Sequence, residues 1–499
     1  MVKQCIVIGA GVGGLAAAIK LKEAGHEVLV LEANEEIGGK LRVLEIEVEG
    51  QVWRFDMGPS LFTQPDYHAA LFEAMGERQA DFFEYWKLET VCNYFFEDGK
   101  RVQAFSEPEK LADELHEKLG EDKQVVLDYL QKSQEKFDIV GEIFLNNPLQ
   151  KLSTYLSGKV ARAVTQMPKL EMLQSMNKLN ASTFRNRDTV QLFDRFATYN
   201  GSDPYKSSAL YSMIPSFEHG QGAYLPKAGM GSIVEAMAAL AMRHGVAIRT
   251  GCKVSEVQTT GKSVRTVVLA NGEQLEADVV VSNVDVNTFY KQVLKTKKAV
   301  PKSIERALST SAIVFYWAMK GSYEELGLHN IFFSGDYAAE FEGLEKRPFE
   351  VPKDATVYVN ITSKYIASDA PTGCENWFVM VNVPADLELS EQAFIDGMRT
   401  MVIEKLEKAL GKPIGSKIVG EKMLQPRSMQ EHTGAWAGAI YGADSNSLFS
   451  GFLRHPNSSS QYANLFFAGG TVHPGGGIPL SIKSGEIAAR LANEWLAKS

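Results

Sequence analysis

Residues 5–14 read CIVIGAGVGG, and this stretch decides the fold of the chain. An apolar strand over residues 5–8 runs directly into the pattern G-x-G-x-x-G, whose glycines are Gly9, Gly11 and Gly14. The first glycine of this pattern makes a tight turn, the second lets the backbone approach a pyrophosphate, and the third lets helix and strand pack closely. An Ala- and Leu-rich helix follows, and then a strand that ends in Glu32. This order predicts a βαβ unit that binds a dinucleotide.

Two features that follow the first glycine turn favour FAD over NAD and NADP. Glu32 lies roughly 20 residues beyond the turn, where an acid binds ribose hydroxyls and disfavours the 2′-phosphate of NADP. A second glycine pair, Gly38-Gly39, is followed by Lys40, at the place where the pyrophosphate and ribityl chain of a larger cofactor would extend. An NAD enzyme has no evident need for this extension.

The C-terminal end carries a second glycine-rich turn. Residues 466–479 read FFAGGTVHPGGGIP, a strand that enters a turn crowded with glycine, and a helix is predicted over residues 481–491. The free N–H groups at the start of such a helix can approach a polar cofactor closely. Both ends of the chain are therefore expected to meet at one cofactor.

These two ends together resemble the glutathione-reductase-type flavoproteins and, within them, the carotenoid desaturases of the bacterial phytoene desaturase type. The resemblance extends over nearly the whole chain, and its most specific motif is HPGGGIP at residues 473–479. Two departures, Ala228 in place of a usual glycine and the sequence Arg454-His455-Pro456, bear on the substrate rather than on the cofactor. Three further blocks carry the resemblance: DMGPS at 56–60, YLPKAGMG at 224–231 and VVVSNVD at 279–285.

The resemblance implies an α/β fold, in which a Rossmann-like FAD-binding domain of the glutathione-reductase/amine-oxidase type is interleaved with an α+β substrate domain. Residues 1–70, 220–290 and 420–499 are expected to form the FAD-binding domain, and residues 71–219 and 291–419 the substrate and membrane-contact domain. The residues expected to hold FAD are Gly9, Gly11, Val12, Gly13, Gly14, Glu32, Gly39, Lys40, Met57, Gly58, Pro59, Ser60, Val254, Asn283, Gly470, Thr471, Gly477, Ile478 and Pro479.

Composition excludes several classes of protein. The chain has 499 residues, of which 45% are hydrophobic and 23% charged, so an ordinary globular protein of two domains is expected. The net charge of −9 argues against a nucleic-acid partner. The four cysteines are scattered without a C-x-x-C pair, so neither a metal site nor a disulfide framework is predicted. This use of cysteine favours a reducing cytoplasm. No run of about 18 uncharged apolar residues predicts a spanning helix, so any contact with the inner face of the membrane is expected to be peripheral.

One segment departs from the acidic average. Between residues 151 and 187 there are seven cations and one acid, and apolar residues recur at helical spacing from Leu149 to Met167. A basic amphipathic helix can lie in a membrane interface, whereas an ordinary core-facing helix shows the same stripe. An insoluble substrate favours the membrane interpretation.

The chemistry implied by the resemblance is the removal of two hydrogens from a long polyene. Oxidised FAD accepts a hydride from a C–H bond, and a proton lost from the neighbouring carbon leaves a new double bond. The flavin is expected to be the main catalytic group, because the sequence shows no convincing nucleophile or acid–base pair. The candidate proton acceptors are His473, His219 and Glu218. The alternatives are that His473 bonds loop carbonyls and that Glu218 and His219 lie in a solvated turn.

The substrate is the least determined part of this interpretation. Glu218-His219 together with the GGGIPL sequence is similar to the branch that desaturates 1-hydroxycarotenoids at the 3,4 position. Four alternatives stay open: a phytoene or diapophytoene desaturase, an FAD-dependent polyene saturase or isomerase, a flavin-free lipid carrier on the same fold, and a flavin amine oxidase. The terminal electron acceptor, a quinone or oxygen, is also left open.

Overall fold

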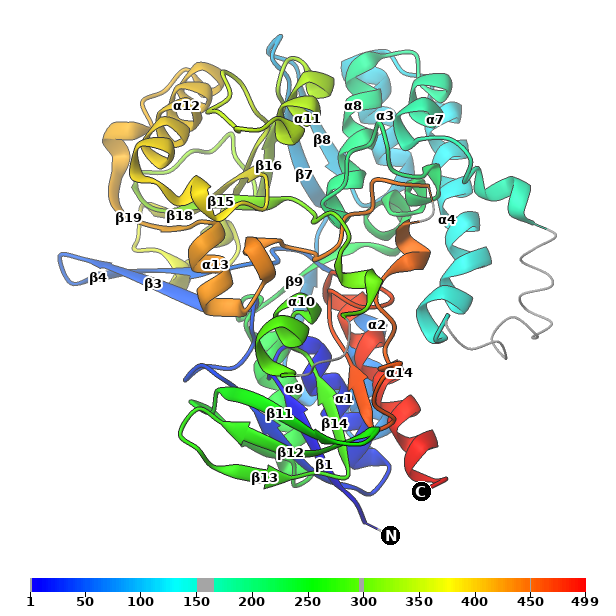
Figure 1. Ribbon diagram of the computed structural model, residues 1–499. Helices are drawn as coiled ribbons and strands as arrows, with labels where there is room; N and C mark the ends of the chain where they lie inside the picture. The colour runs from blue at the N-terminus through cyan, green and yellow to red at the C-terminus, as the bar shows by residue number, and fades with distance from the viewer. Residues whose placement is uncertain (1, 150–165, 296–299, 449) are drawn as a thin grey trace.

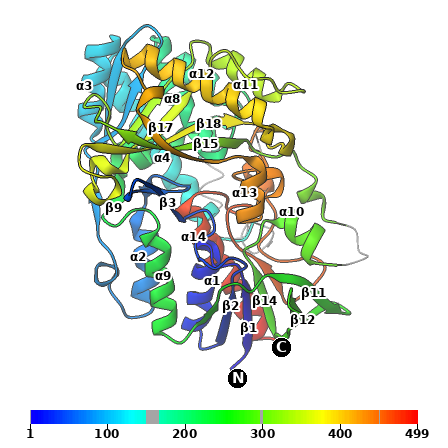
Figure 2. The same ribbon diagram turned by 90° about the vertical axis from the view of Figure 1, so that its left-hand side faces the viewer.

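The computed structural model describes residues 2–149, 166–295, 300–448 and 450–499. One end of the molecule is built on a parallel sheet, and the other on a large mixed sheet flanked by helices (Figure 1). The N- and C-termini lie near each other at the end of the parallel sheet, as Figures 1 and 2 both show. The two ends of the chain thus belong to the same part of the fold.

The parallel sheet follows from the apolar runs in the sequence. Its order is β10-β2-β1-β14-β20, and all of its pairings are parallel. A parallel sheet is covered by helices on its faces, so its strands are buried and apolar throughout, as the VVVS run of β14 is. The strands are β1 Gln4–Ile8, β2 Glu27–Leu31, β10 Ala247–Arg249, β14 Val279–Ser282 and β20 Leu465–Phe467.

Three helices lie against this sheet: α1 Val12–Glu23, α9 Ser232–Arg243 and α14 Ile478–Leu496. The helix predicted over residues 481–491 is α14, which begins earlier because Gly477 caps it and Pro479 fits its first turn. It also ends later, at Leu496. α1 and α14 run side by side, and a Cβ on Gly485 would lie 2.4 Å from the main-chain oxygen of Gly13. Glycine at this position permits the close approach of the two helices.

An antiparallel meander flanks the parallel sheet. Its strands are β11 Val254–Thr260, β12 Ser263–Leu269 and β13 Gln274–Glu276, with Asn271-Gly272 in the turn between β12 and β13. Val257, Val264 and Val267 of the meander pack in one cluster with residues of β1, β2 and β14. The meander therefore packs against the sheet near Leu31, where β2 ends, and Glu32 follows directly.

A seven-stranded sheet forms the other part, in the order β19-β15-β18-β17-β16-β7-β8. β15 is buried along almost its whole length, which fits its uninterrupted run of apolar residues. β19 Ile418–Leu424 pairs with β15 in this sheet. The domain boundaries expected from the sequence stay predictions. The remaining strands are β7 Thr90–Phe95, β8 Arg101–Phe105, β15 Ser311–Lys320, β16 His329–Phe332, β17 Val357–Asn360 and β18 Cys374–Val383.

Two small sheets lie between the large ones. The hairpin of β3 Val43–Val48 and β4 Gln51–Asp56 packs Trp53 and Phe55 against the seven-stranded sheet. β5 Phe62–Thr63, β9 Ala223–Pro226 and β6 Tyr85–Lys87 form the second. The other helices are α2 Pro65–Ala74, α3 Pro108–Leu119, α4 Lys123–Asn146, α7 Met176–Thr183, α8 Arg187–Asp194, α10 Val286–Thr288, α11 Tyr337–Glu345, α12 Gln392–Leu410 and α13 Pro426–Thr433.

The predicted amphipathic helix lies mostly outside the described residues, because residues 150–165 contain most of its stripe and its cations Lys151, Lys159 and Arg162. Within the described part of the chain, no helix has both the length and the hydropathy needed to cross a bilayer.

Candidate functional site: a glycine-lined FAD cradle and an apolar cavity

The first glycine turn has the geometry that its sequence predicts. Gly9 has a φ of +98°, which only glycine adopts readily, and its N–H donates to the main-chain oxygen of Leu31 at 2.8 Å. A Cβ on Gly14 would lie 2.1 Å from the Gly9 oxygen, so the start of α1 packs directly against the end of β1. Gly11 caps α1 without a side-chain bond, which leaves the first N–H groups of the helix available to an anion.

Glu32 is buried directly beside this turn. Its Oε2 accepts the N–H of Ala10 at 2.8 Å, and its Oε1 accepts the N–H of Asn34 at 3.0 Å and the Asn34 side chain at 2.9 Å. A carboxylate offers about four lone-pair sites, so Glu32 keeps capacity for a ribose hydroxyl. The N–H of Cys252 donates to the Glu32 carbonyl at 2.7 Å, which brings the start of β11, with Val254, close to the same position.

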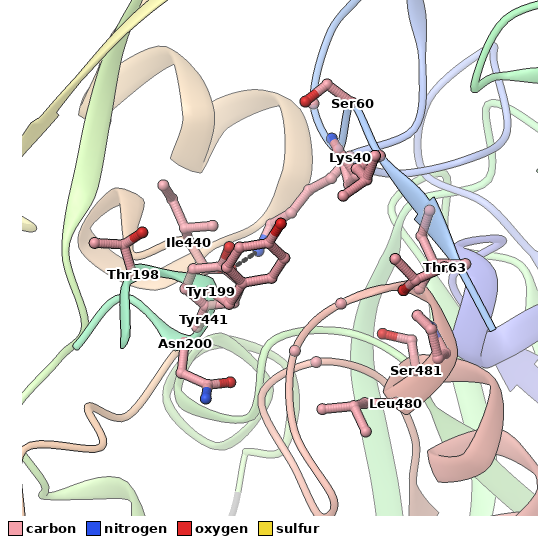
Figure 3. A pocket seen from close by; sticks show the side chains of 18 of the residues that line it. Lys40, Ser60, Thr63, Thr198, Tyr199, Asn200, Ile440, Tyr441, Leu480 and Ser481 are labelled. Atoms are coloured by element: carbon pink, nitrogen blue, oxygen red, sulfur yellow. Dashed lines mark hydrogen bonds between the residues drawn. The ribbon is translucent and has the colours of Figure 1, made fainter. Parts of the chain in front are cut away.

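The second glycine pair and the loop after β4 lie together. A Cβ on Gly58 would lie 2.2 Å from the main-chain oxygen of Lys40, so only glycine fits between these two segments. Lys40 donates a hydrogen bond to the main-chain oxygen of Ile440 (Figure 3). Burial lowers the pKa of Lys40, while Asp285 acts in the opposite direction.

The C-terminal glycine loop is held from inside by Arg454. This guanidinium is buried, and it donates to the main-chain oxygens of Tyr441 at 2.9 Å and Gly470 at 3.2 Å. A Cβ on Gly470 would lie 3.3 Å from the Cα of Gly476, so the two sides of the loop are close together. His455 separates Arg454 from Pro456 in the sequence, but Arg454 still holds the loop through these hydrogen bonds.

One cavity of about 510 Å³ joins these segments. Figure 3 shows side chains from widely separated parts of the chain around it, among them Ser60, Tyr199, Tyr441 and Leu480. Four of the predicted cofactor residues do not line the cavity and lie at or beside the first turn instead: Gly9, Gly14, Glu32 and Val254. The predicted cofactor residues that line the cavity are Gly11, Val12, Gly13, Gly39, Lys40, Met57, Gly58, Pro59, Ser60, Asn283, Gly470, Thr471, Gly477, Ile478 and Pro479.

The donor set around the glycine loops fits FAD. Asp285 caps α10 through Oδ1, but its buried Oδ2 has no hydrogen-bond partner within the described residues. Asp285 lines the cavity, so this oxygen can accept a hydroxyl or an N–H from a bound molecule. Free helix N–H groups suit a pyrophosphate, and buried carboxylates suit ribose and ribityl hydroxyls. The described residues of this cradle therefore fit FAD.

The same cavity continues into an apolar chamber between the two large sheets. Apolar side chains of α4 and of the seven-stranded sheet line this chamber together. Such a lining suits an apolar ligand better than water. The apolar lining residues are Val91, Phe137, Val140, Phe144, Leu145, Met213, Ile214, Phe217, Ala312, Val314, Ile331, Phe378, Met380 and Leu424.

Comparison with known proteins agrees with this geometry. The model of the family "flavin containing amine oxidoreductase" matches residues 12–493. The chain belongs to this family. A 1-hydroxycarotenoid 3,4-desaturase of Flavobacterium sp. (strain P99-3) is 40% identical, over 98% of this chain and 99% of that protein. A 4,4'-diapolycopene oxygenase of Methylomonas sp. is 31% identical, over 97% of each chain.

Solved structures agree on the fold of this flavin-containing oxidoreductase. Cyclohexylamine oxidase from Brevibacterium oxydans IH-35A superposes with a TM-score of 0.61 at 17% identity, over 99% of both chains. An oxidoreductase from Methanosarcina mazei gives a TM-score of 0.61 at 14% identity, over 98% of this chain and 99% of that one. The predicted α/β flavoprotein fold, the FAD cofactor and the resemblance to carotenoid desaturases are confirmed.

Among the candidate proton acceptors of this oxidoreductase, His473 binds the main chain and does not face the cavity. Its Nε2 lies 3.0 Å from the main-chain oxygen of Asn147, so that nitrogen carries a hydrogen and donates it. His473 is buried and is not among the residues that line the cavity. The alternative, a ring that bonds loop carbonyls, is the one this geometry supports.

Glu218 and His219 are both buried, so the alternative of a solvated turn is wrong. Glu218 lines the cavity, and its Oε2 lies 3.2 Å from Nη2 of Arg195. Burial raises the pKa of the Glu218 carboxyl, against the opposing effect of Arg195. His219 donates through Nδ1 to the main-chain oxygen of Phe105 at 2.7 Å and does not line the cavity. Of the three candidates, Glu218 is the one in contact with the cavity, and its catalytic role stays a prediction.

Sequence reasoning missed a polar group inside the apolar chamber, formed by Arg195, His329 and Tyr358. His329 begins β16 and lines the cavity. The hydroxyl of Tyr358 lies 2.7 Å from Nδ1 of His329 and 2.6 Å from Oγ of Ser60. The sequence signal that could have indicated this group is Asp194-Arg195, a charged pair between Phe193 and Phe196.

Proposed function

We propose that this protein introduces a carbon–carbon double bond into a long polyene, and that its substrate is a 1-hydroxycarotenoid desaturated at the 3,4 position. The observation that carries the proposal is the single cavity, which joins the glycine-lined cradle to an apolar chamber. A hydrocarbon chain can lie in such a chamber while one of its bonds reaches the cofactor. The 1-hydroxycarotenoid 3,4-desaturase that is 40% identical supports the choice of substrate.

When bound, FAD accepts the hydride that the reaction removes. The residues of this chain have three other tasks: to hold the polyene, to exclude water and to receive a proton. Apolar side chains such as Phe144, Ile331 and Phe378 provide the first two. Glu218 is our candidate for the third, because it lines the cavity and burial raises the pKa of its carboxyl, which makes the carboxylate a stronger base.

A polyene of this kind is insoluble in water, so we propose a peripheral contact with the cytoplasmic face of a membrane. Met167 and Leu173 support it, since they are 50% and 80% exposed, and Lys169 lies between them in the sequence. Exposed apolar side chains beside cations suit an anionic lipid surface. The electron acceptor that returns FAD to its oxidised state is proposed to be a quinone of this membrane, with oxygen as the alternative.

The experiment that tests the function uses the purified protein loaded with FAD under anaerobic conditions. We expect a 1-hydroxycarotenoid to bleach the flavin absorption band. The bleaching should be absent with putrescine and with cyclohexylamine, which are amine probes for the oxidase alternative. Bleaching by an amine and not by any polyene would overturn the proposal.

A further inference from the structure

The ring of His329 is fixed in one tautomer by its neighbours. Asn360 donates from its side-chain nitrogen to the main-chain oxygen of Leu328 at 3.0 Å, which sets the orientation of the amide. The same nitrogen lies 3.1 Å from Nδ1 of His329. Because an amide nitrogen can only donate, Nδ1 of His329 must accept.

The other ring nitrogen of His329 therefore carries the hydrogen. Burial lowers the pKa of His329 to about 3, and Arg195 acts in the same direction, so the ring is neutral at physiological pH. A neutral imidazole whose Nδ1 accepts has its hydrogen on Nε2. This Nε2 is buried and has no hydrogen-bond partner within the described residues. An unpaired buried donor is costly, which points to a partner supplied from the cavity that the ring lines.

The surroundings of this donor select the chemistry of its partner. Arg195 and Glu218 line the same cavity and already pair with each other at 3.2 Å. A substrate carboxylate would be repelled by Glu218, and an ammonium by Arg195. A neutral oxygen that accepts a hydrogen bond, such as a hydroxyl, meets neither penalty.

We propose that Nε2–H of His329 donates to the hydroxyl oxygen of the polyene and makes this protein specific for hydroxylated substrates. The substrate class in this proposal rests on the proposed function. Ser60 belongs to the loop expected to hold FAD, and Tyr358 links it to His329 by two hydrogen bonds. The hydroxyl therefore binds near the cofactor end of the chamber, so the bond oxidised lies close to the hydroxylated carbon, as a 3,4 bond does relative to a 1-hydroxyl.

The test measures binding of two probes to the FAD-loaded protein in detergent micelles, by quenching of tryptophan fluorescence. One probe is an acyclic polyene with a hydroxyl at C1, and the other is the same hydrocarbon without it. For His329→Leu we expect the Kd of the hydroxylated probe to rise by about 10- to 100-fold and that of the hydrocarbon to change by less than about threefold. His329→Gln keeps an amide donor and should restore part of the difference.

His68→Leu is the matched control, since His68 is also fully buried but does not line the cavity. Its ratio of the two dissociation constants should equal that of the unsubstituted protein. Equal weakening of both probes by His329→Leu, or no weakening of either, would overturn the proposal. Turnover of the same two probes distinguishes the hydroxyl contact of His329 from the proposed function. If the protein binds the hydroxylated probe through His329 but oxidises neither polyene, the proposed function alone is refuted.

Discussion

The main-chain oxygen of Gly13 lies so close to Gly485 that a Cβ on Gly485 would approach it to 2.4 Å. Gly13 belongs to the first glycine turn and Gly485 to α14, so this contact joins the two ends of the chain backbone to backbone. The relative placement of the N-terminal and C-terminal glycine loops depends on it.

Gly485→Ala should therefore push α14 away from α1. We expect a loss of about 1–3 kcal/mol in stability, typical of overpacking, together with weaker retention of FAD. Gly343→Ala is the control, because Gly343 also lies in a helix but has open space around it. The control should be neutral or more stable by up to about 1 kcal/mol, the difference in helix propensity. The measurements are the thermal unfolding midpoint and the flavin content of each variant. Equal midpoints for Gly485→Ala and Gly343→Ala would contradict the contact between α1 and α14.

Glu32→Ala should weaken FAD binding by about 1–3 kcal/mol, because it removes a buried charged acceptor beside the first turn. Glu36→Ala is its control, since Glu36 is exposed in the following loop. Titration of the apoprotein with FAD, followed by flavin fluorescence, gives both affinities. If Glu32→Ala binds FAD as tightly as the control does, Glu32 does not contact the ribose.

The cofactor end of the fold could be predicted from sequence because its signals are local. Gly9, Gly14 and Glu32 lie within one βαβ unit, and the backbone geometry that each requires is encoded at its own position. The Ala- and Leu-rich helix expected after the first glycine turn is α1, which begins at Val12.

The polar group in the chamber could not be predicted in this way. His329, Arg195 and Tyr358 come from three distant segments, and their proximity depends on how β16, β17 and the helical segment after α8 pack. The tautomer of His329 depends further on Asn360, a neighbour on the adjacent strand. His473 is a different case, since its place inside a cofactor motif suggested chemistry, whereas its hydrogen bond to Asn147 supports the structural alternative.

His68→Leu should change how stability depends on pH. Burial lowers the pKa of His68 to about 4, below its ordinary value of 6.5, so the unfolded chain binds a proton between these values and the folded protein does not. The contribution of His68 to the free energy of unfolding is fully present above pH 6.5. It is lost as pH falls towards 4, by about 1.4 kcal/mol per pH unit. The leucine variant lacks this loss, so its thermal midpoint should approach that of the unsubstituted protein as pH falls.

Phe72→Leu is the control for this effect, because Phe72 lies 5.0 Å from His68 between ring centres and does not titrate. Its difference from the unsubstituted protein should stay constant with pH. A His68→Leu difference that is also constant between pH 6.5 and 4 would show that His68 titrates normally.

Leu173→Asp should reduce binding to anionic vesicles several-fold, because it replaces an 80% exposed apolar side chain with an acid, in a stretch of sequence that also carries Lys169 and Lys178. Val52→Asp, on the β3–β4 hairpin, introduces the same charge at a side chain that is 43% exposed and should bind as before. Co-sedimentation at low and high salt measures both, since the electrostatic part is screened within about 8 Å at physiological ionic strength. Equal binding by the two variants would place the membrane contact elsewhere.

The central claim is that this oxidoreductase desaturates a hydroxylated polyene, and the product gives the most direct test. The FAD-loaded protein is incubated with a 1-hydroxycarotenoid and a quinone, with phytoene in a parallel reaction, and the products are analysed by mass and absorption spectrum. We expect the hydroxylated substrate to lose two hydrogens and its absorption to move to the red, while phytoene is unchanged. A gain of two hydrogens with a shift to the blue, an unchanged mass, or successive desaturation of phytoene would contradict the account.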